Sequence, residues 1–115
     1  RKLAKALDLT LGVTDLPLVI QDKQFDAQGN LVYRPNMHES MMGWLGDIVL
    51  ANLTPNAVHA VTPRTYRLRL LNGSNARIYR LAFVRGDNGG LALPFTVIGT
   101  DGGLIERPET VPEAF

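Results

Sequence analysis

The sequence predicts an all-β domain, a Greek-key β-sandwich or barrel, and three observations carry that prediction. Short segments of alternating apolar and polar residues recur along most of the chain. Turn signals rich in Gly, Asn and Pro separate them roughly every 8–12 residues, which marks out about six or seven short strands. The 115 residues are 45% hydrophobic and 20% charged, a composition that can bury a core.

The first elements follow from spacing and turn chemistry. Residues 1–12, RKLAKALDLTLG, carry leucines at helical spacing, so we expect a short helix or a linker there and a domain over 13–115. The first strand is predicted from Asp15 to Phe25, DLPLVIQDKQF. A Gly-Asn turn at 26–30 then returns the chain, so residues 18–34 are predicted to form a hairpin.

The central part is predicted as a loop followed by three strands. PNMHESMMG, residues 35–43, has no strand alternation and is predicted to be a loop. Strands are expected at Asp47–Ala51, at Val58–Val61 and at Thr65–Leu71, where TYRLRLL alternates cleanly. NGSN, residues 72–75, is predicted to be a turn.

The last third is predicted to hold two more strands. ARIYRLAF, residues 76–83, resumes the alternation, and a Gly-rich loop follows over 84–93. PFTVIGTDGG, residues 94–103, is predicted to be a strand that ends at a glycine pair. The final LIERPETVPEAF, residues 104–115, is polar and interrupted by prolines, so no strand is expected there.

Charge and composition exclude several classes of function. The net charge is +1 and the pI about 8.3, below the range of general nucleic-acid-binding domains, and no apolar run is long enough to span a membrane as a helix. We therefore expect no nucleic-acid partner and no membrane span. With no cysteine, the chain has no disulfide, no thiolate nucleophile and no cysteine-containing metal site.

Three arginines cluster around RLRLLNGSNAR, and their role has two interpretations. Arg67, Arg69 and Arg77 could form an anion-binding or nucleic-acid-binding surface. Alternatively they brace the sheet, with buried stems and guanidinium groups paired to carboxylates. Flanking lysines and aromatic residues are sparse, so we favour the structural role. The predicted partner is Asp101 or Asp47.

Histidine and methionine supply weak metal candidates. The two histidines, His38 and His59, lie 21 residues apart in different predicted elements, and a metal site needs three or four ligands. Met37, Met41 and Met42 surround His38 in MHESMM, and thioethers suit Cu(I). The competing interpretation is a loop that packs on a neighbouring domain. We expect no metal site, no cofactor and no catalytic residue in this chain.

Trp44 is the only tryptophan, and it stands between Gly43 and Gly46. Its default role is an anchor in a core or interface. A place in the wall of a substrate site is the alternative.

Four strings in register resemble a known family. They are similar to the middle, cupredoxin-like domain of bacterial three-domain multicopper oxidases, the group of laccases, copper-efflux oxidases and bilirubin oxidases. The resemblance covers about residues 13–115. The strings are DLPLVIQDKQFDAQGNLVY, GWLGDIVLAN, TPRTYRLRLLNGSNARIYRLAF and VIGTDGGLIERP.

The resemblance implies a scaffold and not a catalytic unit. In this family the copper ligands lie in the first and third domains, in His-X-His and His-Cys-His motifs that this sequence lacks. The parent protein would use copper to oxidise phenols, aromatic amines or Cu(I) and to reduce O2 to water. This domain would bridge flanking cupredoxin domains and lend part of the substrate-side wall. Relatives are mostly periplasmic or extracellular.

Two departures from the family pattern accompany the resemblance. The family motif continues beyond PEAF, whereas this sequence ends at Phe115, so the domain is expected to lack its closing strand and to self-associate through an unpaired edge. Leu53 stands where the family commonly has glycine. Two other functions remain open: a scaffold domain of a copper-free cell-division relative of the same superfamily, and a free-standing β-sandwich binding module.

Overall fold

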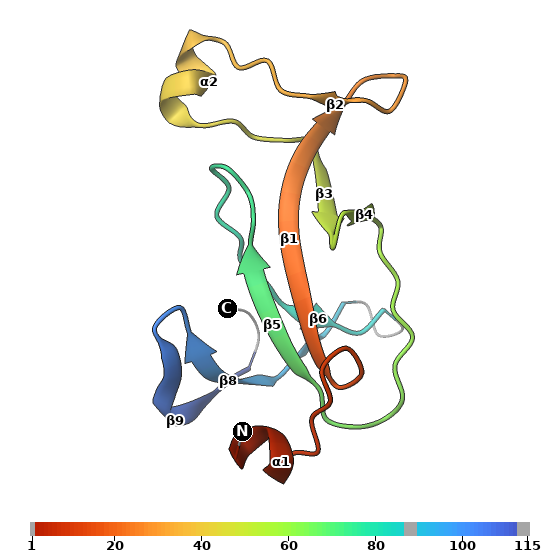
Figure 1. The fold of residues 1–115 in the computed structure, drawn as a ribbon, viewed down its shortest axis with the longest axis vertical. Coiled ribbons are helices and arrows are strands. Elements are labelled where there is room, and N and C mark those ends of the chain that lie inside the picture. Colours follow the sequence, from red (N-terminus) through yellow and green to blue (C-terminus); the bar gives the residue numbers. More distant parts are fainter. Residues whose placement is uncertain (1, 87–89, 113–115) are drawn as a thin grey trace. The chain divides into compact units, whose positions relative to one another are not determined.

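The computed structural model describes residues 2–86 and 90–112 of the chain, which fall into two compact units, Arg1–Ile78 and Tyr79–Phe115. Strands and extended segments dominate both units (Figure 1). Within the described ranges, helices are limited to α1 (Lys2–Ala6) and α2 (Met37–Met42). The predicted all-β class is confirmed.

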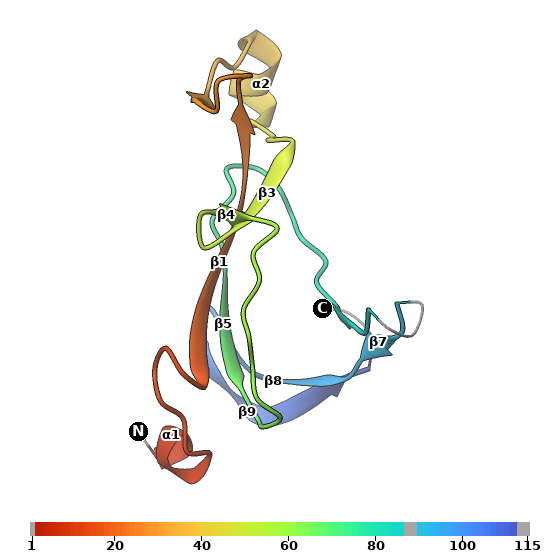
Figure 2. The same cartoon turned by 90° about the vertical axis from the view of Figure 1, so that its right-hand side faces the viewer.

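The first unit is built around one long strand. β1 (Asp15–Phe25) pairs antiparallel with β2 (Leu31–Val32) and β3 (Ile48–Ala51), and parallel with β5 (Arg67–Asn72). β3 also pairs antiparallel with the short β4 (Thr54–Pro55). Both views show β1 running along the unit, with β5 beside its first part and β3 beside its second (Figures 1 and 2). β1 therefore pairs directly with β2, β3 and β5, and β4 is attached through β3.

Few side chains in the first unit are fully buried. Trp44 and Leu50 are its buried apolar residues, and Thr14, Asp15 and Asp22 are its buried polar ones. Many large apolar side chains are exposed instead, among them Val58 at 94% and Ile78 at 94%. Since a buried carboxylate is costly unless it is paired, the two aspartates must be matched by donors. Their partners decide how the unit is held together.

The second unit contains two hairpins. β6 (Phe83–Val84) pairs with β7 (Ala92–Leu93), and β8 (Phe95–Thr100) pairs with β9 (Gly103–Val111), both antiparallel. The rings of Phe83 and Phe95 meet edge to face, with centroids 5.2 Å apart. This aromatic contact joins the two hairpins.

Several predicted elements are found and several predictions are wrong. The hairpin over 18–34 is confirmed by the pairing of β1 with β2, and the strands expected near 47–51, 65–71 and 94–103 appear as β3, β5 and β8. The strand expected at Val58–Val61 is absent, because no neighbouring segment pairs with it in the described part of the chain. Over 76–83, only Phe83 belongs to a strand.

Two longer segments that were not expected to be regular are regular, and the short β7 lies within the predicted loop over 84–93. Residues 37–42 form helix α2, because the side chain of Asn36 caps the helix and Glu39 completes a capping box. Residues 103–111 form β9, because a hairpin edge tolerates Pro108. The centre of the predicted Gly-rich loop, 87–89, and the end of the chain, 113–115, lie outside the described residues.

Candidate functional site

Two glycines place Trp44 against the sheet. Gly43 ends α2 with a φ of 101°, and its N–H donates to the carbonyl of Glu39 at 2.8 Å. A Cβ on Gly43 would overlap the Cβ of Ala76, and a Cβ on Gly46 would overlap the backbone of Lys23. The GWLG segment therefore needs glycine at both ends to approach β1 and the turn after β5.

Trp44 lines a hollow in the first unit. Its side chain is buried, at 9% exposure, and its ring meets that of Tyr33 edge to face, with centroids 5.4 Å apart. The hollow measures about 310 Å³, near the lower end of small-molecule sites. Apolar side chains, one ammonium and one amide line it, and they come from Lys23, Leu31, Val32, Tyr33, Trp44 and Asn75.

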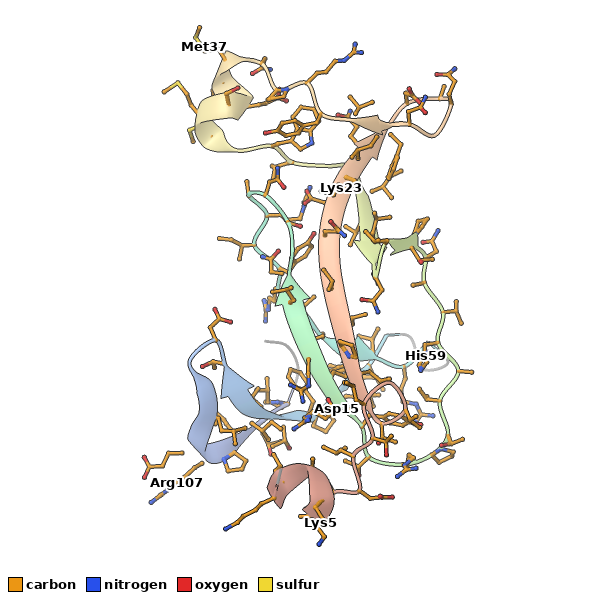
Figure 3. The ribbon with its side chains drawn as sticks, in the orientation of Figure 1. Lys5, Asp15, Lys23, Met37, His59 and Arg107 are labelled. Carbon is orange, nitrogen blue, oxygen red and sulfur yellow. The ribbon has the colours of Figure 1, made fainter. Side chains whose placement is uncertain are left out.

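The lining determines what the hollow can do. Two aromatic rings offer edge and face contacts to another ring, and Lys23 can attract a negative charge or lie over a ring face. Figure 3 places Lys23 toward the end of β1 that carries α2. The arrangement suits binding an aromatic group or packing against a neighbouring surface.

Asp22 connects the segments that carry the residues of this hollow. Its Oδ2 accepts from the N–H of Gly46 at 2.7 Å and from Nε of Arg77 at 2.8 Å, and Arg77 also donates to the Gly46 carbonyl at 2.7 Å. The Asp22 N–H donates to the hydroxyl of Ser74 at 3.0 Å. We call this set, Asp22, Gly46, Ser74 and Arg77, the Asp22 node. It ties β1 to the GWLG segment and to the turn after β5.

The Asp22 carboxylate stays ionised although it is buried, with a side chain only 1% exposed. Burial opposes ionisation, yet hydrogen bonds from Ser74, Arg77 and Gly46 outweigh it and hold the pKa of Asp22 below its usual value. The charge on Asp22 is therefore part of the folded structure.

Asp15 forms a second node at the other end of β1. Arg67 and Arg69 each present two donors to its carboxylate, and Nε of each lies 2.9 Å from Oδ1. Hydrogen bonds from Arg69 and Arg67 hold the pKa of Asp15 far below its usual range, against the opposing effect of burial. We call Asp15, Arg67 and Arg69 the Asp15 node.

The prediction that these arginines pair with Asp47 or Asp101 is wrong. Arg67 and Arg69 pair with Asp15, and Arg77 pairs with Asp22. The parallel register aligns Asp15 with Arg67, and Arg69 lies two residues further on the same face, so both side chains reach Asp15. Asp47 is exposed, and Asp101 belongs to the turn between β8 and β9. Alternation alone could not supply these partners, because it does not show which strands pair.

The methionines and histidines are divided between two places. Met37, His38, Met41 and Met42 lie together on α2. His59 lies in the extended segment after β4, far from α2 along the long axis of the first unit; Figure 3 labels Met37 and His59. The two histidines therefore do not share a site.

Sequence reasoning missed Tyr33, Asn75 and Asp15 as site residues. Tyr33 follows β2 and faces Trp44, and Asn75 lies in the turn after β5. Asp15 carried a usable signal, since an acid that opens a strand can receive arginines spaced two residues apart on a neighbouring strand. Tyr33 and Asn75 carried no such signal, because they come near Trp44 only through contacts between segments that are distant in the sequence.

Comparison with known proteins gives matches that cover only part of each relative. No protein-family model matches the chain. The cell division protein FtsP of Dickeya dadantii is 47% identical over 66 residues, which are 57% of this chain and 13% of that protein. A laccase of Haloferax volcanii is 40% identical over 73 residues, 64% of this chain and 12% of that protein. The chain thus spans about an eighth of these relatives.

The solved structures match nearly the whole chain. The McoA multicopper oxidase of the hyperthermophile Aquifex aeolicus is 51% identical, with a TM-score of 0.88 over 99% of this chain and 24% of that one. Its 2F4 variant is 52% identical, with a TM-score of 0.88 over 99% of this chain and 23% of that one. By sequence and fold, the chain is a cupredoxin-like domain of the multicopper oxidase family.

Proposed function

We propose that this chain is the middle domain of a laccase-like multicopper oxidase, and that it serves as a scaffold and as part of the substrate-side wall. The single observation that carries the proposal is the match to McoA over 99% of the chain at 51% identity. The parent protein would contain copper and oxidise phenols, aromatic amines or Cu(I) one electron at a time. It would pass four electrons to O2 and form water.

The donors of this chain do not fit the copper centres of such an oxidase. There is no cysteine, and the two histidines lie in separate elements, on α2 and in the segment after β4. The proposal therefore assigns those centres to other parts of the parent and derives no catalytic step from this domain.

The proposed role in the wall rests on the Trp44 hollow. Its aromatic and apolar lining, with a volume of about 310 Å³, could accommodate one face of an aromatic substrate. The Asp22 node fixes the segment that carries Trp44, so the ring would be held in one position without a cost in side-chain ordering.

Flanking cupredoxin domains of the same parent are the proposed partners, and they would cover some of the exposed apolar side chains. Self-association through an unpaired strand edge is proposed for the chain when it is separated from them. The parent is proposed to work in the periplasm or outside the cell. Within the described ranges, neither helix has the length and apolar character needed to cross a membrane.

A second candidate is a scaffold domain of a copper-free cell-division protein. The FtsP matches favour it, with 42–47% identity over 66 residues in several organisms. The identity to McoA is higher and extends over nearly the whole chain, so we rank the oxidase first.

The test compares the parent protein with the 115-residue chain. The parent, loaded with copper, is expected to consume O2 with a phenol as electron donor, and replacing Trp44 by Ala is expected to raise KM for the phenol while leaving the copper content unchanged. The chain alone is expected to show no O2 uptake. A parent that folds but consumes no O2 would support the second candidate.

A further inference from the structure

We propose that Asn72 is a site of spontaneous deamidation that the fold keeps closed, and that it opens when the turn after β5 separates from β1. The reaction converts Asn72 to aspartate or isoaspartate. This inference does not depend on the proposed function, because every contact that it uses lies within residues 19–77 of this chain.

The chemistry needs an asparagine followed by an unhindered residue. The backbone nitrogen of Gly73 attacks Cγ of Asn72, a C–N bond closes a succinimide ring, and the side-chain amino group leaves as ammonia with the proton of the Gly73 N–H. Water then opens the ring at Cγ to give aspartate, or at the main-chain carbonyl carbon to give isoaspartate. Because glycine has no Cβ to block the approach, Asn72-Gly73 is a reactive dipeptide.

The fold favours glycine at this position. The turn passes so close to β1 that a Cβ on Gly73 would lie 3.0 Å from Cγ1 of Val19. A larger residue would press the turn away from the strand. The reactive dipeptide is therefore a consequence of how closely this turn packs on β1.

Hydrogen bonds hold both reacting groups in the folded turn. Nδ2 of Asn72 donates to the Arg77 carbonyl at 2.8 Å, and Oδ1 of Asn72 accepts from the Ser74 N–H at 3.0 Å. The Gly73 N–H, which must lose its proton in the reaction, donates to the Ile20 carbonyl at 2.7 Å. Asn72 is also the last residue of β5 and pairs with Ile20. The side-chain amide turns toward the Gly73 nitrogen only after these bonds break, so the reaction requires local opening of the turn.

The Asp22 node controls that opening. The hydroxyl of Ser74 accepts from the Asp22 N–H at 3.0 Å, and Nε of Arg77 lies 2.8 Å from Oδ2 of Asp22. Ser74 and Arg77 are also the residues whose backbone groups hold the Asn72 amide. Loss of a contact in the node should therefore release Asn72 as well.

Either product fits the closed turn less well than asparagine does. A carboxylate at position 72 has no N–H to donate to the Arg77 carbonyl, so acceptor oxygens would face each other there. Isoaspartate lengthens the main chain and moves the end of β5 out of register with β1. A brief opening of the turn is thus converted into a permanent change.

The test measures deamidation of Asn72 in the full-length parent, incubated at mildly alkaline pH in buffer and in urea. Trypsin releases LLNGSNAR, residues 70–77, and mass spectrometry with fragmentation assigns the modified position. We expect Asn72 to react at least about tenfold faster in urea, because only the open fraction of folded molecules can react. Asn75, in the same peptide but followed by Ala76, is the internal reference and should stay largely unmodified. Equal rates in buffer and in urea, or modification mainly at Asn75, would overturn the proposal.

Ser74→Ala tests the coupling to the Asp22 node. It removes the acceptor of the Asp22 N–H and keeps the backbone N–H of residue 74, so the rate in buffer should rise about three- to tenfold while the rate in urea stays unchanged. Ser40→Ala, the same change on α2, is the matched control and should alter neither rate. Asn72→Asp, which reproduces one product, should lower the urea midpoint more than Asn75→Asp does. A rate in buffer that is the same for Ser74→Ala and Ser40→Ala, or equal midpoints in the two aspartate variants, would contradict the proposal.

Discussion

The two ends of β1 are both held by a buried carboxylate, but in different ways. At the first end, Asp15 receives two arginines from the neighbouring parallel strand, so a side-chain cluster reinforces a strand pairing that already exists. At the other end, Asp22 receives one arginine together with neutral donors from Gly46 and Ser74, and it joins segments that no strand pairing connects. The Asp15 node therefore keeps a cationic partner when one arginine is lost, and the Asp22 node does not.

This difference bears on function as well as on stability. The Asp22 node hydrogen-bonds to the backbone of Gly46, two residues after Trp44, and so helps to fix the position of Trp44. The Asp15 node holds the opposite end of β1. Substitutions in the Asp22 node should therefore change the position of Trp44 and the shape of the hollow. Substitutions in the Asp15 node should weaken the pairing of β1 with β5 and leave the hollow unchanged.

Arg77→Met should give the largest loss. It removes the one cationic partner of the Asp22 carboxylate, which is 1% exposed, and leaves it with neutral donors from Gly46 and Ser74. Breaking a buried pair from one side costs about 3–5 kcal/mol of unfolding free energy, a large fraction of the stability of a small domain. Urea unfolding followed by circular dichroism measures this cost.

Arg69→Met is the matched variant for the other node. Arg69 is 56% exposed, and Asp15 keeps Arg67, so the loss should not exceed about 1 kcal/mol. Equal losses of unfolding free energy in the two variants would show that the second arginine at Asp15 does not protect that node.

Gly46→Ala should give the next largest effect. It moves the GWLG segment while leaving the charged groups of Asp22 and Arg77 in place, so it separates the effect of the position of Trp44 from that of the ion pair. The added Cβ overlaps the backbone of Lys23, so the GWLG segment must move away from β1. We expect about 1–3 kcal/mol of destabilisation and a shift in Trp44 fluorescence. Gly102→Ala, where a Cβ meets nothing within 4 Å, is the control and should change neither.

Acid should weaken both nodes. The folded-state pKa values of Asp15 and Asp22 are lowered by their hydrogen bonds, so their contribution is present above the unfolded value, about 3.9, and is lost as pH falls through the folded values. Urea midpoints should be nearly constant from about pH 7 to 5 and fall below about pH 4. Asp15→Asn should flatten that fall, and Asp47→Asn, at an exposed position, should leave it unchanged.

The same contrast separates what the sequence predicts from what it does not. Alternation located β1, β3, β5 and β8, because a half-buried strand imposes a period of two whatever its neighbours are. It could not show that β5 runs parallel to β1, and so it assigned Arg67 and Arg69 to the wrong acids. It also read residues 35–43 as a loop, although Asn36 and Glu39 stand at the spacing of a capping box. The two flanking glycines mark Trp44 in the sequence, whereas Tyr33 and Asn75 join it only through tertiary contacts.

Leu53→Gly should give the smallest effect, and it is the one change expected to stabilise. Asn52 and Leu53, with φ of 48° and 65°, form the two-residue turn between β3 and β4, and positive φ at both positions is the pattern of a type I′ turn. Leucine is strained there and glycine is not.

Asn52 also fixes this turn to β1 between the two nodes, since its side chain accepts from the Val19 N–H at 2.8 Å and donates to the Pro17 carbonyl at 3.1 Å. Relief of the strain at Leu53 should therefore raise the unfolding free energy by about 1 kcal/mol, measured by urea unfolding. Leu91→Gly, at an exposed position without positive φ, should instead lower it by about 0.5–1 kcal/mol. If Leu53→Gly destabilised the chain as much as Leu91→Gly, the packing of the Leu53 side chain would outweigh its backbone strain. The attachment of this turn to β1 would then depend on the Leu53 side chain and not on the backbone conformation of the turn.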